Sequence, residues 1–137
     1  MIQKMPVVLD TNVLVSALWS ENGVPAKILH MVPYGAIMPI YSAEILQEYG
    51  TVLNRPSFKF LPGQVDGLLQ KFVQHGRLVL PERSSIPLPD ESDRVFYDTA
   101  TTGSAILITG NAKHFPDEPF IMSPSDFYRY LLEKNKF

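Results

Sequence analysis

Short apolar runs alternate along the chain with segments in which apolar residues recur at helical spacing. The runs that predict buried strands are 7–9, 36–40, 77–80, 105–109 and 120–122. Prolines or N-cap serines open the segments between them, which predict helices at 26–32, 43–53, 64–75, 93–102 and 125–133. This alternation predicts a three-layer α/β/α fold with a central parallel sheet of about five strands, because βαβ crossovers place helices on both faces. In such sheets, sites form outside the carboxyl ends of the strands.

Length and composition indicate one folded unit. The chain has 137 residues, of which 45% are hydrophobic and 19% are charged. This size is ordinary for one domain, and the chain is too apolar to be disordered. We therefore expect a single domain over residues 1–137. A proline cluster at 81–89 is too short and isolated for an interdomain linker, and we interpret it as an extended surface loop.

Several classes of site and location are excluded or disfavoured. The absence of cysteine excludes disulfides, a thiolate zinc site and a cysteine nucleophile. A formal net charge of −2 means that any RNA must bind through a local patch. The start at 1–6 lacks the apolar segment of a signal peptide, and no run is long enough to span a membrane. We expect a cytoplasmic protein with no membrane association.

Asp10 directly follows the first predicted strand. An unpaired charge is costly to bury, so this carboxylate should project into the crevice at the carboxyl end of that strand. An Asp-Thr-Asn sequence suits a helix N-cap or a turn equally well. Both interpretations remain open at this point.

Two further helices carry acids that could share this edge of the sheet. Asp93 begins a helix that also contains Asp98, but these residues lie about 140° apart on the helix, so at most one of them is a direct ligand. An acidic first helical turn would also explain Asp93. Glu44 and Glu48 lie one turn apart on the helix that begins after Ser42, and Glu48 flanks its apolar face. A solvated rim position is the common alternative for either glutamate.

Thr109, Gly110 and Asn111 end a later buried strand and place polar groups at the same edge as Asp10. An ordinary strand-ending turn would use the same residues. Carboxylates and other oxygen ligands suit Mg²⁺ or Mn²⁺. The shared placement of these groups, more than any single acid, predicts a divalent-metal site.

Four motifs, taken in order, resemble the PIN-domain family, and within it the toxins of toxin–antitoxin systems. They are VLDTNVLVSA at 8–17, SAEILQEY at 42–49 with VLNRP at 52–56, Asp93 followed by Ala100, and ITGNAKHFP at 108–116. The resemblance covers nearly the whole chain. It implies a metal-dependent ribonuclease on a five-stranded parallel sheet.

Carried over by motif, the resemblance implies that Asp10, Glu48 and Asp93 are the catalytic metal ligands. The fourth acidic position of the family is Asn111 here, a neutral ligand that weakens cation binding, especially at a second metal position. Asp98 or a water could compensate. Whether Glu44 replaces Glu48 as the helix ligand stays open.

The function expected is cleavage of single-stranded RNA with Mg²⁺ or Mn²⁺, by the toxin of a toxin–antitoxin pair whose small antitoxin occludes the site. Candidate substrate contacts near the motif ends are Asn12, Arg55, Lys59, Arg94, Thr109, Lys113 and His114. Each cation could equally be a solvated surface charge. The RNA target, DNA cleavage and homodimer formation are left open by the sequence.

Two alternatives remain. A PIN-like domain could bind RNA or a partner with weak or absent catalysis, as Asn111 would allow. A phosphatase of the haloacid-dehalogenase type also begins with a strand-ending aspartate. However, Asn12 stands where that class needs a second acid, and no acidic pair follows Thr109.

Overall fold

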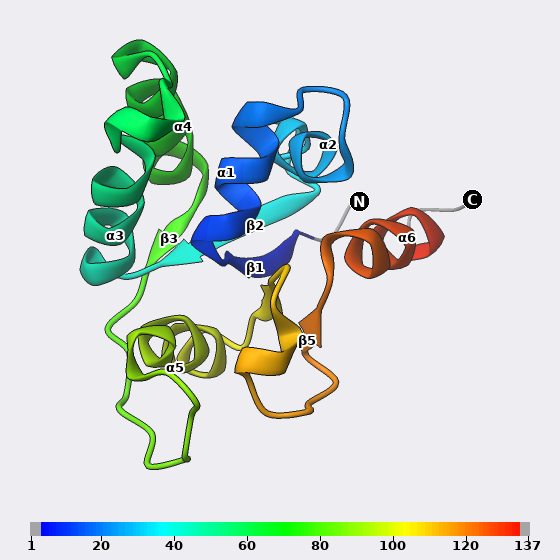
Figure 1. Ribbon diagram of the computed structural model, residues 1–137. Helices are drawn as coiled ribbons and strands as arrows, with labels where there is room; N and C mark the ends of the chain where they lie inside the picture. Colours follow the sequence, from blue (N-terminus) through cyan, green and yellow to red (C-terminus); the bar gives the residue numbers. More distant parts are fainter. Residues whose placement is uncertain (1–3, 135–137) are drawn as a thin grey trace.

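The computed structural model describes residues 4–134 and contains a sheet of five parallel strands (Figure 1). The strands are β1 (Met5–Leu9), β2 (Ile37–Tyr41), β3 (Arg77–Leu78), β4 (Ile106–Ile108) and β5 (Ile121–Met122). Their order in the sheet is β3-β2-β1-β4-β5. The predicted parallel α/β architecture is therefore confirmed. Residues 1–3, which belong to the segment 1–6 considered for a signal peptide, lie outside the described residues.

The central strand β1 is buried on both faces. Val7, Val8 and Leu9 are fully buried, as a strand between two layers of helices requires. β1 pairs with β2 through Met5 and Ile37, and with β4 through Leu9 and Ile108. The carboxyl ends of β1 and β4 therefore lie side by side.

Six α-helices surround the sheet. They are α1 (Thr11–Trp19), α2 (Val24–His30), α3 (Ala43–Leu53), α4 (Pro62–His75), α5 (Arg94–Thr102) and α6 (Pro124–Lys134). In Figure 1, α1, α2 and α4 lie above the sheet and α5 lies below it. α5 packs on the central strands β1, β2 and β4, while α6 packs beside α2. In the part of the chain that is described, no helix is long and apolar enough to cross a membrane.

The structure differs from the sequence-based elements in two places. Helix α1 was not predicted, because its apolar run at 13–15 contains two β-branched valines and adjoins a strand. Strand β3 has two residues instead of the predicted 77–80. It is an exposed edge strand, and Val79 extends its pairing by one hydrogen bond to Tyr41 before the chain enters the proline-rich segment. Three short 3₁₀ helices, η1 (Pro56–Phe58), η2 (Glu91–Asp93) and η3 (Ala112–His114), complete the fold.

A close backbone approach joins α4 to the sheet. A Cβ atom on Gly76 would lie 2.3 Å from the Pro39 carbonyl oxygen and 2.6 Å from that of Phe72. Only glycine fits this position without a backbone shift, so it lets α4 end against β2 and turn directly into β3.

Candidate active site at the carboxyl edge of the sheet

Asp10 occupies the N-cap position of α1, but its side chain does not cap the helix. Instead its Oδ2 accepts a hydrogen bond of 2.8 Å from the Thr109 hydroxyl at the end of β4, and one of 3.4 Å from the Asn12 amide. The residue is only 8% exposed. The capping role that the sequence allowed is therefore excluded, and the carboxylate faces the junction of β1 and β4.

Glu48 reaches the same edge from α3. Ser42 caps this helix by accepting a hydrogen bond from the Ile45 N–H, which fixes where the helix starts. Two turns later, Glu48 Oε2 accepts a hydrogen bond of 3.2 Å from the hydroxyl of Thr11, the residue next to Asp10. Glu48 is half-buried, whereas Glu44 is exposed one turn earlier. Of the two glutamates, the structure therefore brings Glu48 to Asp10.

Asp93 approaches from the opposite face, at the end of η2 and the start of α5. Its Oδ2 is buried and forms no hydrogen bond with any residue of 4–134, and it lies 3.4 Å from Nδ1 of His114 in η3. A buried carboxylate oxygen without a hydrogen bond is uncommon and points to a missing ligand or cation. Sequence position alone gave no sign that His114 would stand beside Asp93.

The three carboxylates of Asp10, Glu48 and Asp93, called the acidic site below, influence one another electrostatically. Burial raises the pKa of Asp10, and the negative charges of Asp93 and Glu48 raise it further, against the hydrogen bond from Thr109, which lowers it. Burial likewise raises the pKa of Asp93, with Asp90 and Glu48 adding to it and His114 opposing. Like charges that raise one another's pKa favour a cation between them.

Asn12 ties the two central loops together. Its amide nitrogen donates to Asp10, and its Oδ1 accepts a hydrogen bond of 3.1 Å from the N–H of Gly110. Thr109 completes the link, since its hydroxyl accepts from the N–H of Asn111 while it donates to Asp10. Both residues were predicted as substrate contacts, but the structure occupies their polar groups in positioning Asp10.

Comparison with known proteins identifies the chain. A family model described as the PIN domain matches residues 6–113. The chain belongs to the PIN-domain family. An uncharacterized protein of Methanocaldococcus jannaschii is 33% identical over 111 residues, which make up 79% of this chain and 72% of that protein. The family resemblance drawn from the sequence motifs is thus confirmed.

The fold of this PIN domain is also found in a solved structure. A chain in the crystal structure of VapBC2 from Rickettsia felis bound to a DNA fragment from their promoter superposes with a TM-score of 0.54. The two share 19% sequence identity, and the match covers 87% of this chain and 97% of that one. At this identity the likeness concerns the fold alone.

Arg94 and Asp98, both expected near the PIN-domain site, bind the proline-rich segment at 81–89. Arg94 is only 7% exposed, and its guanidinium donates hydrogen bonds to the Ser84 carbonyl and hydroxyl and to the Ile86 carbonyl, while it pairs with Glu91. Asp98 accepts a hydrogen bond of 3.1 Å from the N–H of Ser84. Both side chains anchor the proline-rich segment to α5. The guanidinium of Arg94 has no donor left for a substrate, contrary to the prediction. Oδ1 of Asp98 is buried and forms no hydrogen bond among the described residues, so the suggestion that Asp98 compensates for Asn111 stays a prediction.

The remaining predicted contacts are exposed. Asn111 and Lys113 lie in or next to η3, close in sequence to His114. Arg55 and Lys59 flank η1, beyond the end of α3 and away from its Glu48 turn. Thr11 is the site residue that the sequence did not single out, and its only signal is its place between Asp10 and Asn12.

The acidic site fits a divalent cation in kind. Its donors are carboxylate oxygens, the ligands that Mg²⁺ and Mn²⁺ prefer, and Asp93 Oδ2 forms no hydrogen bond among the described residues. The carboxylates do not yet converge on one point, since no three acidic or histidine side chains within residues 4–134 are already placed to hold one ion. Small side-chain rotations would therefore have to accompany cation binding.

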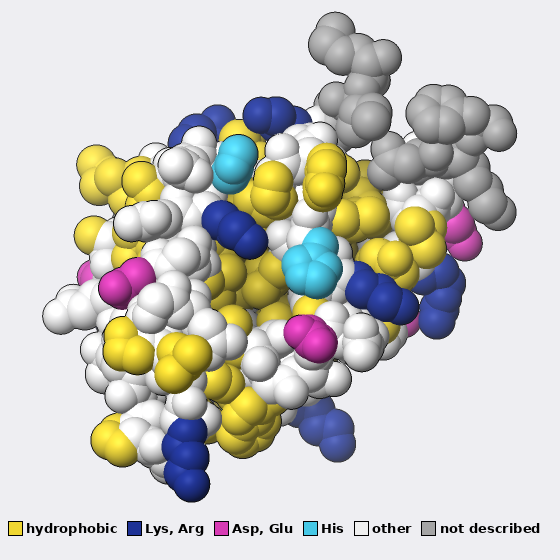
Figure 2. All heavy atoms as spheres, turned by 90° about the horizontal axis from the view of Figure 1, so that it is seen from above, with side chains coloured by type: hydrophobic (Ala, Val, Ile, Leu, Met, Phe, Trp, Pro, Cys, Tyr) yellow, Lys and Arg dark blue, Asp and Glu magenta, His cyan; other side chains and the backbone are white. Residues whose placement is uncertain are grey.

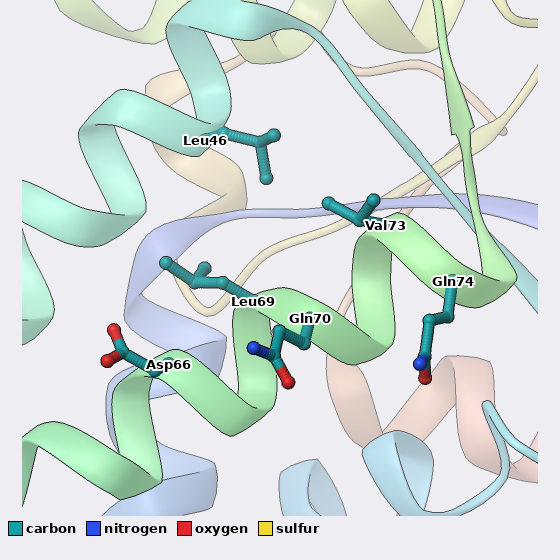
Figure 3. Close-up of a pocket in the computed structure, with 6 residues that line it drawn as sticks. All are labelled: Leu46, Asp66, Leu69, Gln70, Val73 and Gln74. Carbon is teal, nitrogen blue, oxygen red and sulfur yellow. The ribbon is translucent and has the colours of Figure 1, made fainter.

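A second groove offers no comparable chemistry. It lies between α3 and α4, and its lining residues are Leu46, Asp66, Leu69, Gln70, Val73 and Gln74 (Figure 3). Leu46 and Glu48 are two residues apart on α3, so they face in nearly opposite directions. Asp66 is the one charged side chain that lines this groove, so the groove lacks the clustered carboxylates of the acidic site.

Proposed function

We propose that this PIN domain is a divalent-metal-dependent endoribonuclease that hydrolyses phosphodiester bonds of single-stranded RNA. The observation that carries the proposal is the placement of Asp10, Glu48 and Asp93, from three different elements, near enough at the carboxyl edge of the sheet for the charges of Asp93 and Glu48 to raise the pKa of Asp10. Membership of a family whose members are generally nucleases supports it.

In this proposal Asp10, Glu48 and Asp93 hold Mg²⁺ or Mn²⁺. The metal, when bound, lowers the pKa of a water and neutralises charge that develops on the phosphoryl oxygens. Thr109 and Asn12 hold Oδ2 of Asp10 in place by hydrogen bonds. Thr11 orients Glu48, and the exposed side chains of Lys113 and His114, in the short helix η3, would contact the RNA backbone.

The biological setting we propose is the toxin of a toxin–antitoxin pair in the cytoplasm. The fold match to a chain of a VapBC2 complex supports a small protein antitoxin as the partner. Asn111 in place of a fourth acid favours one firmly held metal, with a second that depends on substrate. The same residue favours the second candidate, a domain that binds RNA without cutting it.

The test is cleavage of single-stranded RNA as Mn²⁺ or Mg²⁺ is titrated into the purified protein. We expect no cleavage without metal, and a loss of at least about a hundredfold for Asp10→Asn, Glu48→Gln or Asp93→Asn. Glu44→Gln is the matched control, because Glu44 is exposed one turn before Glu48, and it should retain activity. RNA binding without cleavage at any metal concentration would favour the binding domain, and turnover of a phosphate monoester would favour a phosphatase.

A further inference from the structure

An exposed aromatic cluster lies at the far end of α1 from the acidic site. Trp19, the last residue of α1, meets Phe58 edge-on with ring centroids 5.3 Å apart and Phe60 at 6.2 Å. Phe58 and Phe60 stack at 5.5 Å with an interplanar angle of 20°. Trp19 is 65% exposed, so much of its ring is open to solvent. These three rings are called the aromatic platform below.

The segment that carries Phe58 and Phe60 is positively charged, whereas the exposed acid Glu21 lies two residues after Trp19. The segment 54–61 carries Arg55 and Lys59 and no acid. Both cations are exposed, and neither forms an ion pair within the described part of the chain. A chain of net charge −2 therefore presents a local cationic patch here, beside stacked rings.

A separate groove lies between α1, α2 and α4. It starts beside Ala17 and Leu18, and its charged or titratable side chains are His30 and Lys71, with no acid in the lining. Figure 2 looks onto this side of the molecule and shows a hollow with hydrophobic side chains on its floor, bordered by Lys or Arg, His, and Asp or Glu side chains. Apolar surface bordered by cations matches a strand that carries stacking bases and phosphates.

The platform is within reach of an RNA strand at the acidic site. α1 begins at Thr11, beside Asp10, and ends at Trp19, a span of about 12 Å at roughly 1.5 Å per residue. Such a distance corresponds to only a few nucleotides. We propose that the aromatic platform stacks unpaired bases of the RNA whose backbone crosses the acidic site, with Arg55 and Lys59 holding the adjoining phosphates. This inference rests on the proposed function for its substrate class.

Trp19 is the single tryptophan of the chain, so its fluorescence reports on the platform directly. The probe is a single-stranded oligoribonucleotide titrated into the Asp10→Asn protein, with fluorescence quenching and the anisotropy of labelled RNA measured together. We expect saturable quenching at the RNA concentration that also raises the anisotropy. Because the readout needs no cleavage, quenching without any nuclease activity in the parent would support the platform while refuting the proposed function.

Matched variants separate stacking from hydrophobic contact. Trp19→Leu keeps apolar bulk but no ring, and should weaken RNA binding about tenfold, whereas Trp19→Phe should weaken it less than about threefold. Lys59→Asn keeps a residue tolerated at its left-handed φ of 58° and should lower the slope of log affinity against log salt by about 0.7. Arg129→Gln, on α6, is the control cation and should leave that slope unchanged.

Three results would overturn the proposal. The first is RNA cleavage or binding with no change in Trp19 fluorescence, and the second is no RNA binding at all. The third is Trp19→Leu and Trp19→Phe binding RNA as tightly as the parent. If that result came with concentration-dependent self-association that Trp19→Leu weakens, the rings would instead form a protein-docking surface.

Discussion

A single hydroxyl group joins the helix that carries Glu48 to the strand that carries Asp10. Tyr49 is fully buried, and its hydroxyl donates a hydrogen bond to the carbonyl of Leu9, the residue before Asp10. Burial raises the pKa of Tyr49 well above its ordinary value, and the carboxylates of Asp10 and Glu48 raise it further, so the group remains a donor at all working pH values. Tyr49→Phe removes this link and little else.

The magnitude follows from what the substitution leaves in place. The ring keeps its contacts with Phe72 at 5.5 Å and Phe96 at 6.4 Å, so no cavity forms. What is lost is one neutral hydrogen bond, a net contribution of about 0.5–1.5 kcal/mol, and the carbonyl of Leu9 loses a partner at a further cost of about 1–3 kcal/mol if nothing replaces it. We expect the free energy of unfolding to fall by about 1.5 kcal/mol and Tm by about 5 °C.

Urea denaturation followed by circular dichroism measures this change, with an unchanged m value showing that the unfolding transition is the same. Tyr41→Phe is the matched control. Tyr41 is also a buried tyrosine, but its hydroxyl makes no hydrogen bond within the described residues, so its loss should change the free energy by less than about 0.5 kcal/mol. Equal stabilities for Tyr49→Phe and the parent would refute the view that this bond holds α3 to β1.

Three further predictions concern packing, pH and metal. Gly76→Ala should lower the free energy of unfolding by at least about 1–3 kcal/mol, since its Cβ would lie 2.3 Å from the Pro39 carbonyl oxygen. Gly67→Ala on α4, where a Cβ would have no atom within contact distance, should raise the free energy of unfolding by up to about 1 kcal/mol. Urea denaturation measures both changes. The pKa of Asp10 in the folded protein lies above the ordinary value of 3.8, which applies to the unfolded chain. Above pH 3.8 the folded state therefore binds more protons than the unfolded state, and the metal-free protein loses stability as the pH rises through the folded pKa. Melting curves should therefore favour Asp10→Asn over the parent at pH 7 and show no such advantage at pH 3. Mn²⁺ should raise the Tm of the parent, because a free Mn²⁺ concentration of a hundred times Kd stabilises the folded state by about 2.7 kcal/mol. The Tm of Asp10→Asn should not change, and equal shifts for both proteins would mean that the ion binds elsewhere.

The fold was predictable because parallel strands that are buried on both faces appear in the sequence as short continuous apolar runs. The strands at 7–9 and 105–109 were recognised from such runs, and both lie in the centre of the sheet. Helix α1 was not, because Val13 and Val15 favour strands locally, and only packing against α2 and α3 makes the segment a helix. Local propensity fails where tertiary contacts decide the conformation.

The acids of the site were predictable from their place at strand and helix ends, whereas the partners of individual side chains were not. Arg94 and Asp98 follow the same proline-rich segment as Asp93, and charge alone suggests that all three face the substrate. Their roles differ only because the segment folds back and brings Ser84 against α5. There the guanidinium of Arg94 donates to the Ser84 carbonyl, and the carboxylate of Asp98 accepts from the Ser84 N–H. A contact between residues 10 or more positions apart leaves no local pattern in the sequence.

This anchoring of the loop bears on how Asp93 functions. Asp93 and Arg94 are adjacent, yet one has a buried oxygen without a hydrogen bond while the other satisfies its guanidinium completely with loop and Glu91 oxygens. Because Arg94 is engaged on the loop side of α5, it is not available to neutralise Asp93, and the side chain that lies 3.4 Å from Oδ2 of Asp93 is the exposed imidazole of His114. The start of α5 therefore keeps Asp93 close to Asp10 and Glu48 without a cationic side chain of its own to pair with it. Carboxylates that are not paired with Lys or Arg repel one another, and this repulsion destabilises the ionised, metal-free protein. The same repulsion favours binding of a divalent cation, and a loss of stability of this kind is expected where function determines the choice of residues.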